Sequence, residues 1–88
     1  MQMIFKCGEE IVNKHSDGGN IYGWRNPFQV IPEVGDFIEL GEHTPEFTHL
    51  EYKPMVKYIV KSRTFSAVEN YNHTYKDQKC VIELEKVN

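Results

Sequence analysis

The segment from residue 31 to residue 40 constrains the fold of this chain more than any other. Pro32 has a fixed φ, and Gly35 can take a positive φ without steric cost, so the segment predicts a turn with Pro32 at its first central position. The run after this turn alternates between two faces, with Ile38 and Leu40 on one and Phe37 and Glu39 on the other. A turn that leads into an alternating run predicts a β-strand and therefore a sheet.

Further short runs of β type predict more strands, and no amphipathic run reaches the ten or so residues that a helix needs. The predicted strands lie at residues 1–7, 9–14, 28–31, 36–40, 55–65 and 79–86. Long polar or Gly-rich segments separate them, including a loop at 66–78. We therefore expect one all-β domain over residues 1–88, a small antiparallel, partly open barrel of five or six short strands with long loops.

Two of the runs predict which side chains face the interior. Met3, Phe5 and Cys7 share a face in the first run, and Cys80, Ile82 and Leu84 share a face in the last. If these two strands pair, Cys7 and Cys80 are neighbours and act as small apolar core residues.

Charge and length exclude several classes of protein. Ten lysines and arginines against 13 aspartates and glutamates give a net charge of −3, whereas a dedicated nucleic-acid-binding protein is usually basic. No apolar run approaches the roughly 18 residues of a membrane span. The first residues lack the features of a secretory signal, so we expect a cytoplasmic protein, in the host cell if it is phage-encoded, with Cys7 and Cys80 as thiols.

The order of the central motifs resembles a group of small, mostly uncharacterised phage and prophage proteins. The motifs are Ile31-Pro-x-x-Gly-Asp-x-Ile-x-Leu40, then Tyr58-x-Val60, a charged hairpin and Val81-Ile-x-Leu-Glu85. The resemblance covers residues 28–88 and implies a Src-homology-3-like barrel, with no catalytic residue carried over. Residues 1–27 lie outside it, so this protein's own function could reside there.

The loop Tyr22-Gly-Trp24-Arg25-Asn26 is the first candidate binding site. Trp, Tyr and Arg dominate binding hot spots because they bury a large area with few rotatable bonds and can still form hydrogen bonds. The structural alternative is that Trp24 closes one end of the barrel as a core side chain.

The loop at 66–78 is the second candidate. Its Tyr71, His73 and Tyr75 would lie on one face if the chain stays extended, where they could stack on a base or contact a partner protein. The alternative is a solvated hairpin whose tyrosines pack on their own backbone.

Lys57, Lys61 and Arg63 form the third candidate, a basic row on one strand that could bind phosphates. If the last two strands pair, however, these cations lie opposite Glu83 and Glu85. Such cross-strand pairs need no ligand and contribute a few tenths to about 1 kcal/mol each.

Metal binding and catalysis have little support. The four histidines and two cysteines lack Cys-x-x-Cys or His-x-x-x-His spacing, and Ser16, Ser62 and Ser66 lie in no nucleophile motif. We expect no metal, no cofactor and no enzymatic activity.

These patterns favour a non-catalytic binding protein of a phage or mobile element that inhibits a host defence or regulatory protein by stoichiometric contact. One alternative is a homo-oligomeric sponge for a signalling nucleotide, with Trp24 or Tyr71 stacking on the base and Arg25 or Arg63 binding phosphate. The other is a single-strand nucleic-acid-binding module that uses the row from Lys57 to Arg63.

Overall fold

The computed structural model describes residues 1–13, 24–41, 43–45, 50–52 and 55–87, with the backbone alone for 43–45 and 50–52. These residues form β-strands and no helix, so the predicted all-β class is confirmed. The strands are β1 (Gln2–Cys7), β2 (Glu10–Ile11), β3 (Phe37–Leu40), β4 (His43–Pro45), β5 (Leu50–Tyr52), β6 (Val56–Glu69) and β7 (Tyr75–Lys86).

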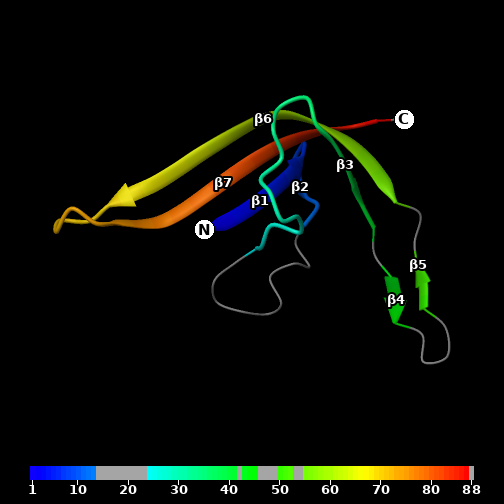
Figure 1. The fold of residues 1–88 in the computed structure, drawn as a ribbon, viewed down its shortest axis with the longest axis horizontal. Helices are drawn as coiled ribbons and strands as arrows, with labels where there is room; N and C mark the ends of the chain where they lie inside the picture. Colours follow the sequence, from blue (N-terminus) through cyan, green and yellow to red (C-terminus); the bar gives the residue numbers. More distant parts are fainter. Residues whose placement is uncertain (14–23, 42, 46–49, 53–54, 88) are drawn as a thin grey trace.

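Five strands form one curled sheet in the order β2-β1-β7-β6-β3, which makes an open half-barrel, while β4 and β5 pair separately (Figure 1). The pairs β1–β2, β7–β6 and β6–β3 are antiparallel, as expected. The pair β1–β7 is parallel, which corrects the prediction of a purely antiparallel barrel. No short turn joins these two strands, so the hairpin geometry that enforces an antiparallel pair does not apply to them.

The core covers one face of this sheet, where alternate residues of four neighbouring strands meet. Phe5 lies opposite Ile82 across β1 and β7, and Leu84 lies opposite Val60 across β7 and β6. The buried set is Met3, Phe5, Ile38, Tyr58, Val60, Cys80, Ile82 and Leu84. The inward faces predicted for the first strand, the last strand and β3 are therefore confirmed.

The two cysteines lie on paired strands without being partners. Cys7 is opposite Leu84, and Cys80 is opposite Met3, so their positions differ by four residues along the sheet. Both are free thiols. Burial raises the pKa of the fully buried Cys80, and the nearby Arg63 guanidinium acts in the opposite direction. A buried thiol of raised pKa is unreactive, in keeping with a packing role.

The central turn forms two positions later than predicted. The Asp36 N–H donates to the Glu33 carbonyl at 3.0 Å, so Val34 and Gly35 occupy the central positions, and Gly35 takes φ +94°. Pro32 therefore precedes the turn. The Gly35 N–H also donates to the Val60 carbonyl at 2.9 Å, which joins the turn to β6. The positive φ expected at Gly35 is confirmed, since this turn type requires it.

Several strand limits differ from the sequence prediction. Residues 28–31 form no strand, and the predicted strand at 9–14 is reduced to β2. The predicted loop at 66–78 is mostly strand, because β6 continues to Glu69 and β7 begins at Tyr75. Polar residues favoured a loop there, whereas cross-strand pairing extends the ribbon almost to its turn.

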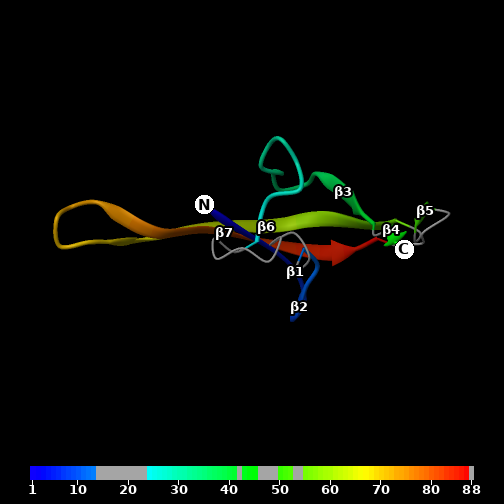
Figure 2. The same cartoon turned by 90° about the horizontal axis from the view of Figure 1, so that it is seen from below.

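The outer part of the β6–β7 hairpin projects from the half-barrel as a two-stranded ribbon (Figures 1 and 2). We call residues 62–78 the arm. Its base, residues 62–66, pairs with the part of β7 that also pairs with β1, and only its outer part, residues 67–78, is two-stranded. Paired β3 residues end opposite Ile59 of β6, and paired β1 residues end opposite Lys79 of β7. The arm contributes to an elongated molecule, 53 Å along its longest axis and 24 Å along its shortest.

We expect stability to fall at alkaline pH through Tyr58. Burial raises the pKa of this phenol above its usual 10.0, and negative charge on Cys7 and Glu10 acts in the same direction. The unfolded chain then loses the proton first, so stability is complete below about pH 10 and decreases as the pH rises toward the folded-state pKa. Urea unfolding at pH 8 and pH 10.5 should show a smaller alkaline loss for Tyr58→Phe than for the unmodified protein. Equal losses would contradict this assignment.

Candidate functional site

The arm carries the most exposed aromatic side chain of the described residues. Tyr71 at its turn is 98% exposed, and Tyr75, Phe65 and Val68 are 61%, 53% and 51% exposed. A two-stranded ribbon is only marginally stable in water, and these side chains bury little surface in return. Large apolar side chains gathered on an exposed projection indicate a surface that contacts another molecule.

Local hydrogen bonds shape the turn of the arm. The Asn70 N–H donates to the Thr74 carbonyl at 2.6 Å, and the His73 N–H donates to the Asn70 carbonyl at 3.0 Å. His73 takes φ +65°, so this part of the chain is not extended. The extended arrangement that would place Tyr71, His73 and Tyr75 on one face is therefore not formed.

His73 contacts the strand beside it, since its Nδ1 lies 3.2 Å from Oε1 of Glu69. Its ring remains largely exposed. Tyr71 has no hydrogen bond or ring contact within the described residues, so its phenol ring remains available to a partner.

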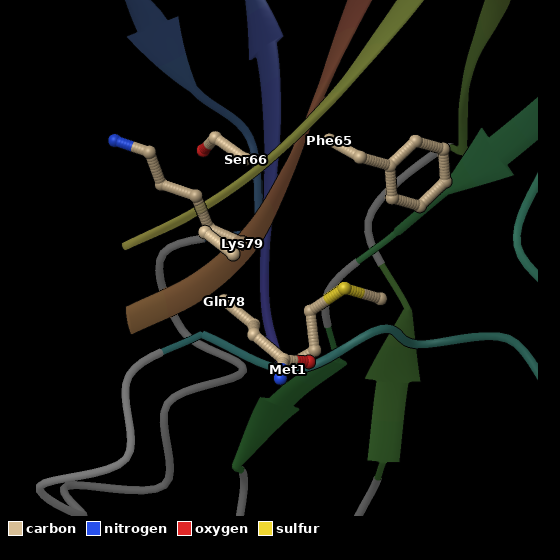
Figure 3. A pocket seen from close by; sticks show the side chains of 6 residues that line it. Met1, Phe65, Ser66, Gln78 and Lys79 are labelled. Carbon is tan, nitrogen blue, oxygen red and sulfur yellow. The ribbon is translucent and has the colours of Figure 1, made fainter. Parts of the chain in front are cut away.

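A shallow hollow of about 250 Å³ lies at the base of the arm. Its lining includes Met1, Phe65, Ser66, Gln78 and Lys79 (Figure 3). Phe65 and Lys79 project to opposite sides of the ribbon, and Met1 lies on the side of Phe65. The hollow is open and is lined by flexible chains, so it suits contact with a protein surface better than enclosure of a small molecule.

The loop predicted as the first candidate site is partly anchored to the sheet. The Trp24 carbonyl accepts a hydrogen bond from the Met3 N–H at 3.0 Å, and the Arg25 carbonyl accepts one from Nδ2 of Asn13 at 3.1 Å. Trp24 is half-buried and Arg25 is exposed, whereas Tyr22 lies outside the described residues. The structure thus gives this segment a scaffolding role beside any binding role.

Asn26 organises its own loop. Its Oδ1 accepts from the Phe28 N–H at 3.0 Å, and its Nδ2 donates to the Val30 carbonyl at 2.9 Å. An asparagine side chain that accepts from the backbone two residues later forms a turn, and Pro27 occupies the position between the two bonded residues.

The predicted basic row does not continue along one face of β6. Val60 pairs with Leu84 and Ser62 pairs with Glu83, so Lys61 is an extra residue and the alternation reverses after it. Arg63 consequently pairs with the inward-facing Ile82. The bulge therefore places Arg63 on the opposite face from Lys61.

Each of these cations instead has a neighbour within the chain. Nζ of Lys61 lies 3.5 Å from Oε2 of Glu85, which confirms the predicted pairing between the last two strands at this position. The Lys57 ammonium lies 4.8 Å from the centre of the Phe37 ring, and the Arg63 guanidinium lies 5.7 Å from the centre of the Phe65 ring. The exposed ion pair contributes at most about 1 kcal/mol.

A second hollow, of about 280 Å³, adjoins β3 and was not predicted from the sequence. Its lining includes Phe28, Val30, Pro32, Phe37 and Glu39. The signal for it was Phe37, an aromatic side chain on the outer face of an alternating strand.

Within the described ranges, no group of three or more His, Cys, Asp or Glu side chains gathers to hold a metal ion. The same residues include no helix of the length and hydropathy needed to cross a membrane. The structure of this part of the chain thus adds no metal centre to the candidate surfaces.

Comparison of the chain with models of protein families, with curated proteins and with solved structures finds no match. The structural class of this protein therefore rests on its fold and its candidate site. The protein is a small all-β protein, an open half-barrel with a projecting hairpin arm.

Proposed function

We propose that this protein acts by stoichiometric, non-catalytic contact with another protein, and that the arm makes this contact. The exposure of Tyr71 carries the proposal, because a tyrosine that is 98% exposed at the end of a projecting ribbon contributes almost nothing to the fold. Tyrosine is enriched in binding hot spots because its ring buries area at low entropic cost. The neighbouring Tyr75 enlarges the same surface.

The specific form of the proposal is inhibition of a host defence or regulatory protein in the cytoplasm by a phage or mobile-element protein. The resemblance of residues 28–88 to small phage proteins supports this form. The single-strand nucleic-acid alternative has less support, because the bulge at Lys61 interrupts the basic row. The nucleotide sponge requires Trp24 or Tyr71 to stack on a base, and no enclosed cavity accompanies either residue in the described structure.

We expect Tyr71→Ala to weaken target binding while leaving the fold unchanged. The test starts with capture from a bacterial host lysate, followed by purification of the captured protein and calorimetric titration. The unmodified protein should saturate at one target per chain, and Tyr71→Ala should weaken binding at least about tenfold.

The matched control is Met55→Ala, since Met55 is 59% exposed and lies just before β6, at the end far from the arm. This variant should bind as the unmodified protein does. Trp24→Ala, in the same titration, tests the first candidate loop. Equal affinities for Tyr71→Ala and the unmodified protein would refute the role of the arm.

A further inference from the structure

A second surface of the molecule, away from the arm, lies along β3. This strand is the last of the five-stranded sheet, so one of its edges pairs with β6 and the other has no strand partner among the described residues. The hollow of about 280 Å³ lies at this second edge, because its lining includes side chains from both faces of β3 and none from β6. Its opposite wall is the segment from residue 28 to residue 32, which lies on the other side of β3 from β6 (Figure 1).

Two residues of β3 direct their peptide groups to this outer edge. The Val60 N–H donates to the Asp36 carbonyl at 2.9 Å, and bonded pairs alternate with non-bonded pairs along an antiparallel ladder. Two residues further on, Ile38 therefore bonds to β6. The N–H and C=O groups of Phe37 and Glu39 consequently point away from β6.

The bonds on the other side of β6 agree with this alternation. Lys57 pairs with Glu39, and the Lys57 carbonyl accepts from the Val87 N–H at 2.8 Å, so the peptide groups of Lys57 face away from β3. The outer edge of β3 thus presents peptide donors and acceptors that can pair with an added strand. Main-chain bonds of this kind provide affinity when an extended peptide joins a sheet.

The hollow beside this edge is lined mainly by apolar side chains. Phe28, Val30, Pro32 and Phe37 contribute to it, and Val30 and Phe37 are 73% and 58% exposed. Its volume falls just below the roughly 300–1,000 Å³ of small-molecule sites. The hollow therefore fits a side chain of an extended segment better than a separate small ligand, since alternate side chains of an added strand enter such pockets.

The charge along the edge indicates the chemistry of the partner. Asp36 and Glu39 line the hollow, and neither forms an ion pair within the described residues. Lys57 is opposite Glu39 in the sheet, but its ammonium lies over the Phe37 ring, 4.8 Å from the ring centre. Two carboxylates beside an apolar hollow favour a basic segment and disfavour an acidic one.

We propose that the outer edge of β3 binds an extended, basic segment of a partner protein as an added antiparallel strand. A cationic side chain of this segment lies opposite Glu39, the next side chain is apolar and enters the hollow beside Ile38, and the one after it lies opposite Phe37. A second cation follows and reaches Asp36. Antiparallel pairing is the more stable kind per residue. This surface is separate from the arm, so the inference does not depend on the proposed function.

A peptide titration followed by nuclear magnetic resonance tests the inference. The probe is acetyl-Thr-Arg-Val-Val-Arg-Thr-amide, added to isotopically labelled protein. We expect saturable binding with the largest amide shifts at Phe37 and Glu39, and exchange of these two amide protons at saturation should slow at least about tenfold. The Ile38 amide, which already bonds to β6, should change little. No binding at about 1 mM peptide, or shifts confined to the arm, would overturn the proposal.

Two N-methylated forms of the probe test the main-chain pairing. In the proposed register the second valine lies opposite Phe37, and methylation removes its N–H donor and places a methyl group against the strand edge. This form should bind at least about tenfold more weakly. Methylation of the first valine, whose N–H points away from β3, adds the same group and should leave the affinity nearly unchanged. Equal affinities of the two forms would contradict an added strand.

Charge variants test the basic character of the partner. Glu39→Gln should weaken binding of the probe at least about threefold. The matched control Glu83→Gln makes the same change in net charge at an exposed position of β7 and should have no effect. A probe with glutamate in place of both arginines should bind at least about tenfold more weakly. Tyr71→Ala should bind the probe as the unmodified protein does, which separates this result from the test of the arm. Equal effects of Glu39→Gln and Glu83→Gln would refute the site.

Discussion

Phe5→Ala is expected to leave most of the protein unfolded at 25 °C. Phe5 is fully buried, lies opposite Ile82 and contacts the Phe28 ring edge to face, with ring centres 6.1 Å apart. Removing a buried phenylalanine costs about 3–5 kcal/mol, from lost burial and the cavity left behind. A domain of this size with one small core has a total stability of only about 5 kcal/mol, so this loss removes most or all of it.

Urea unfolding followed by circular dichroism measures the effect, with loss of the folded baseline in Phe5→Ala as the expected result. Phe65→Ala is the matched control, because Phe65 is 53% exposed on the arm and its loss should change stability by less than about 1 kcal/mol. If both variants lost the same stability, the assignment of Phe5 to the core would be wrong.

Asn13→Ala is expected to have the second largest effect, a loss of about 2–4 kcal/mol. Asn13 is buried, and its Oδ1 accepts from the Phe5 N–H at 3.0 Å. Its Nδ2 donates to the Met3 carbonyl at 2.8 Å and to the Arg25 carbonyl at 3.1 Å. Alanine removes the carboxamide that bonds these three backbone groups, and each buried polar group left without a partner costs about 1–3 kcal/mol.

The same unfolding measurement applies to Asn13→Ala, with Asn26→Ala as its control. Asn26 also forms two side-chain bonds to backbone, but one of them is exposed, so water can replace part of the interaction. We expect Asn26→Ala to lose less than half as much stability as Asn13→Ala. An equal loss would mean that burial of Asn13 contributes nothing beyond its bonds.

These stability effects are separable from the effects of arm variants. The core residues lie where β1, β7, β6 and β3 adjoin, whereas Tyr71 and Phe65 are exposed on the arm. Substitutions of these arm residues should therefore alter binding at nearly constant stability. This separation allows a loss of binding to be assigned to contact rather than to unfolding.

The Asn13 interaction had no signal in the sequence, for a general reason. An asparagine after a short β run is usually a surface turn residue. Here the chain returns beside β1, and the carboxamide reaches two backbone segments that are far apart in sequence. The segment at Arg25 lies close enough to β1 for the buried Asn13 side chain to connect the two, and the sequence does not show this proximity.

The local pattern of residues was sufficient to predict the inward faces of β1, β3 and β7 and the positive φ of Gly35. Side-chain alternation and steric freedom are properties of neighbouring residues, so they can be read without knowledge of distant contacts. Three features depended on contacts between distant segments: the parallel pairing of β1 with β7, the bulge at Lys61 and the length of the arm. Strand partners and register follow from which segments meet across the whole chain, and one extra residue in a strand reverses every face beyond it.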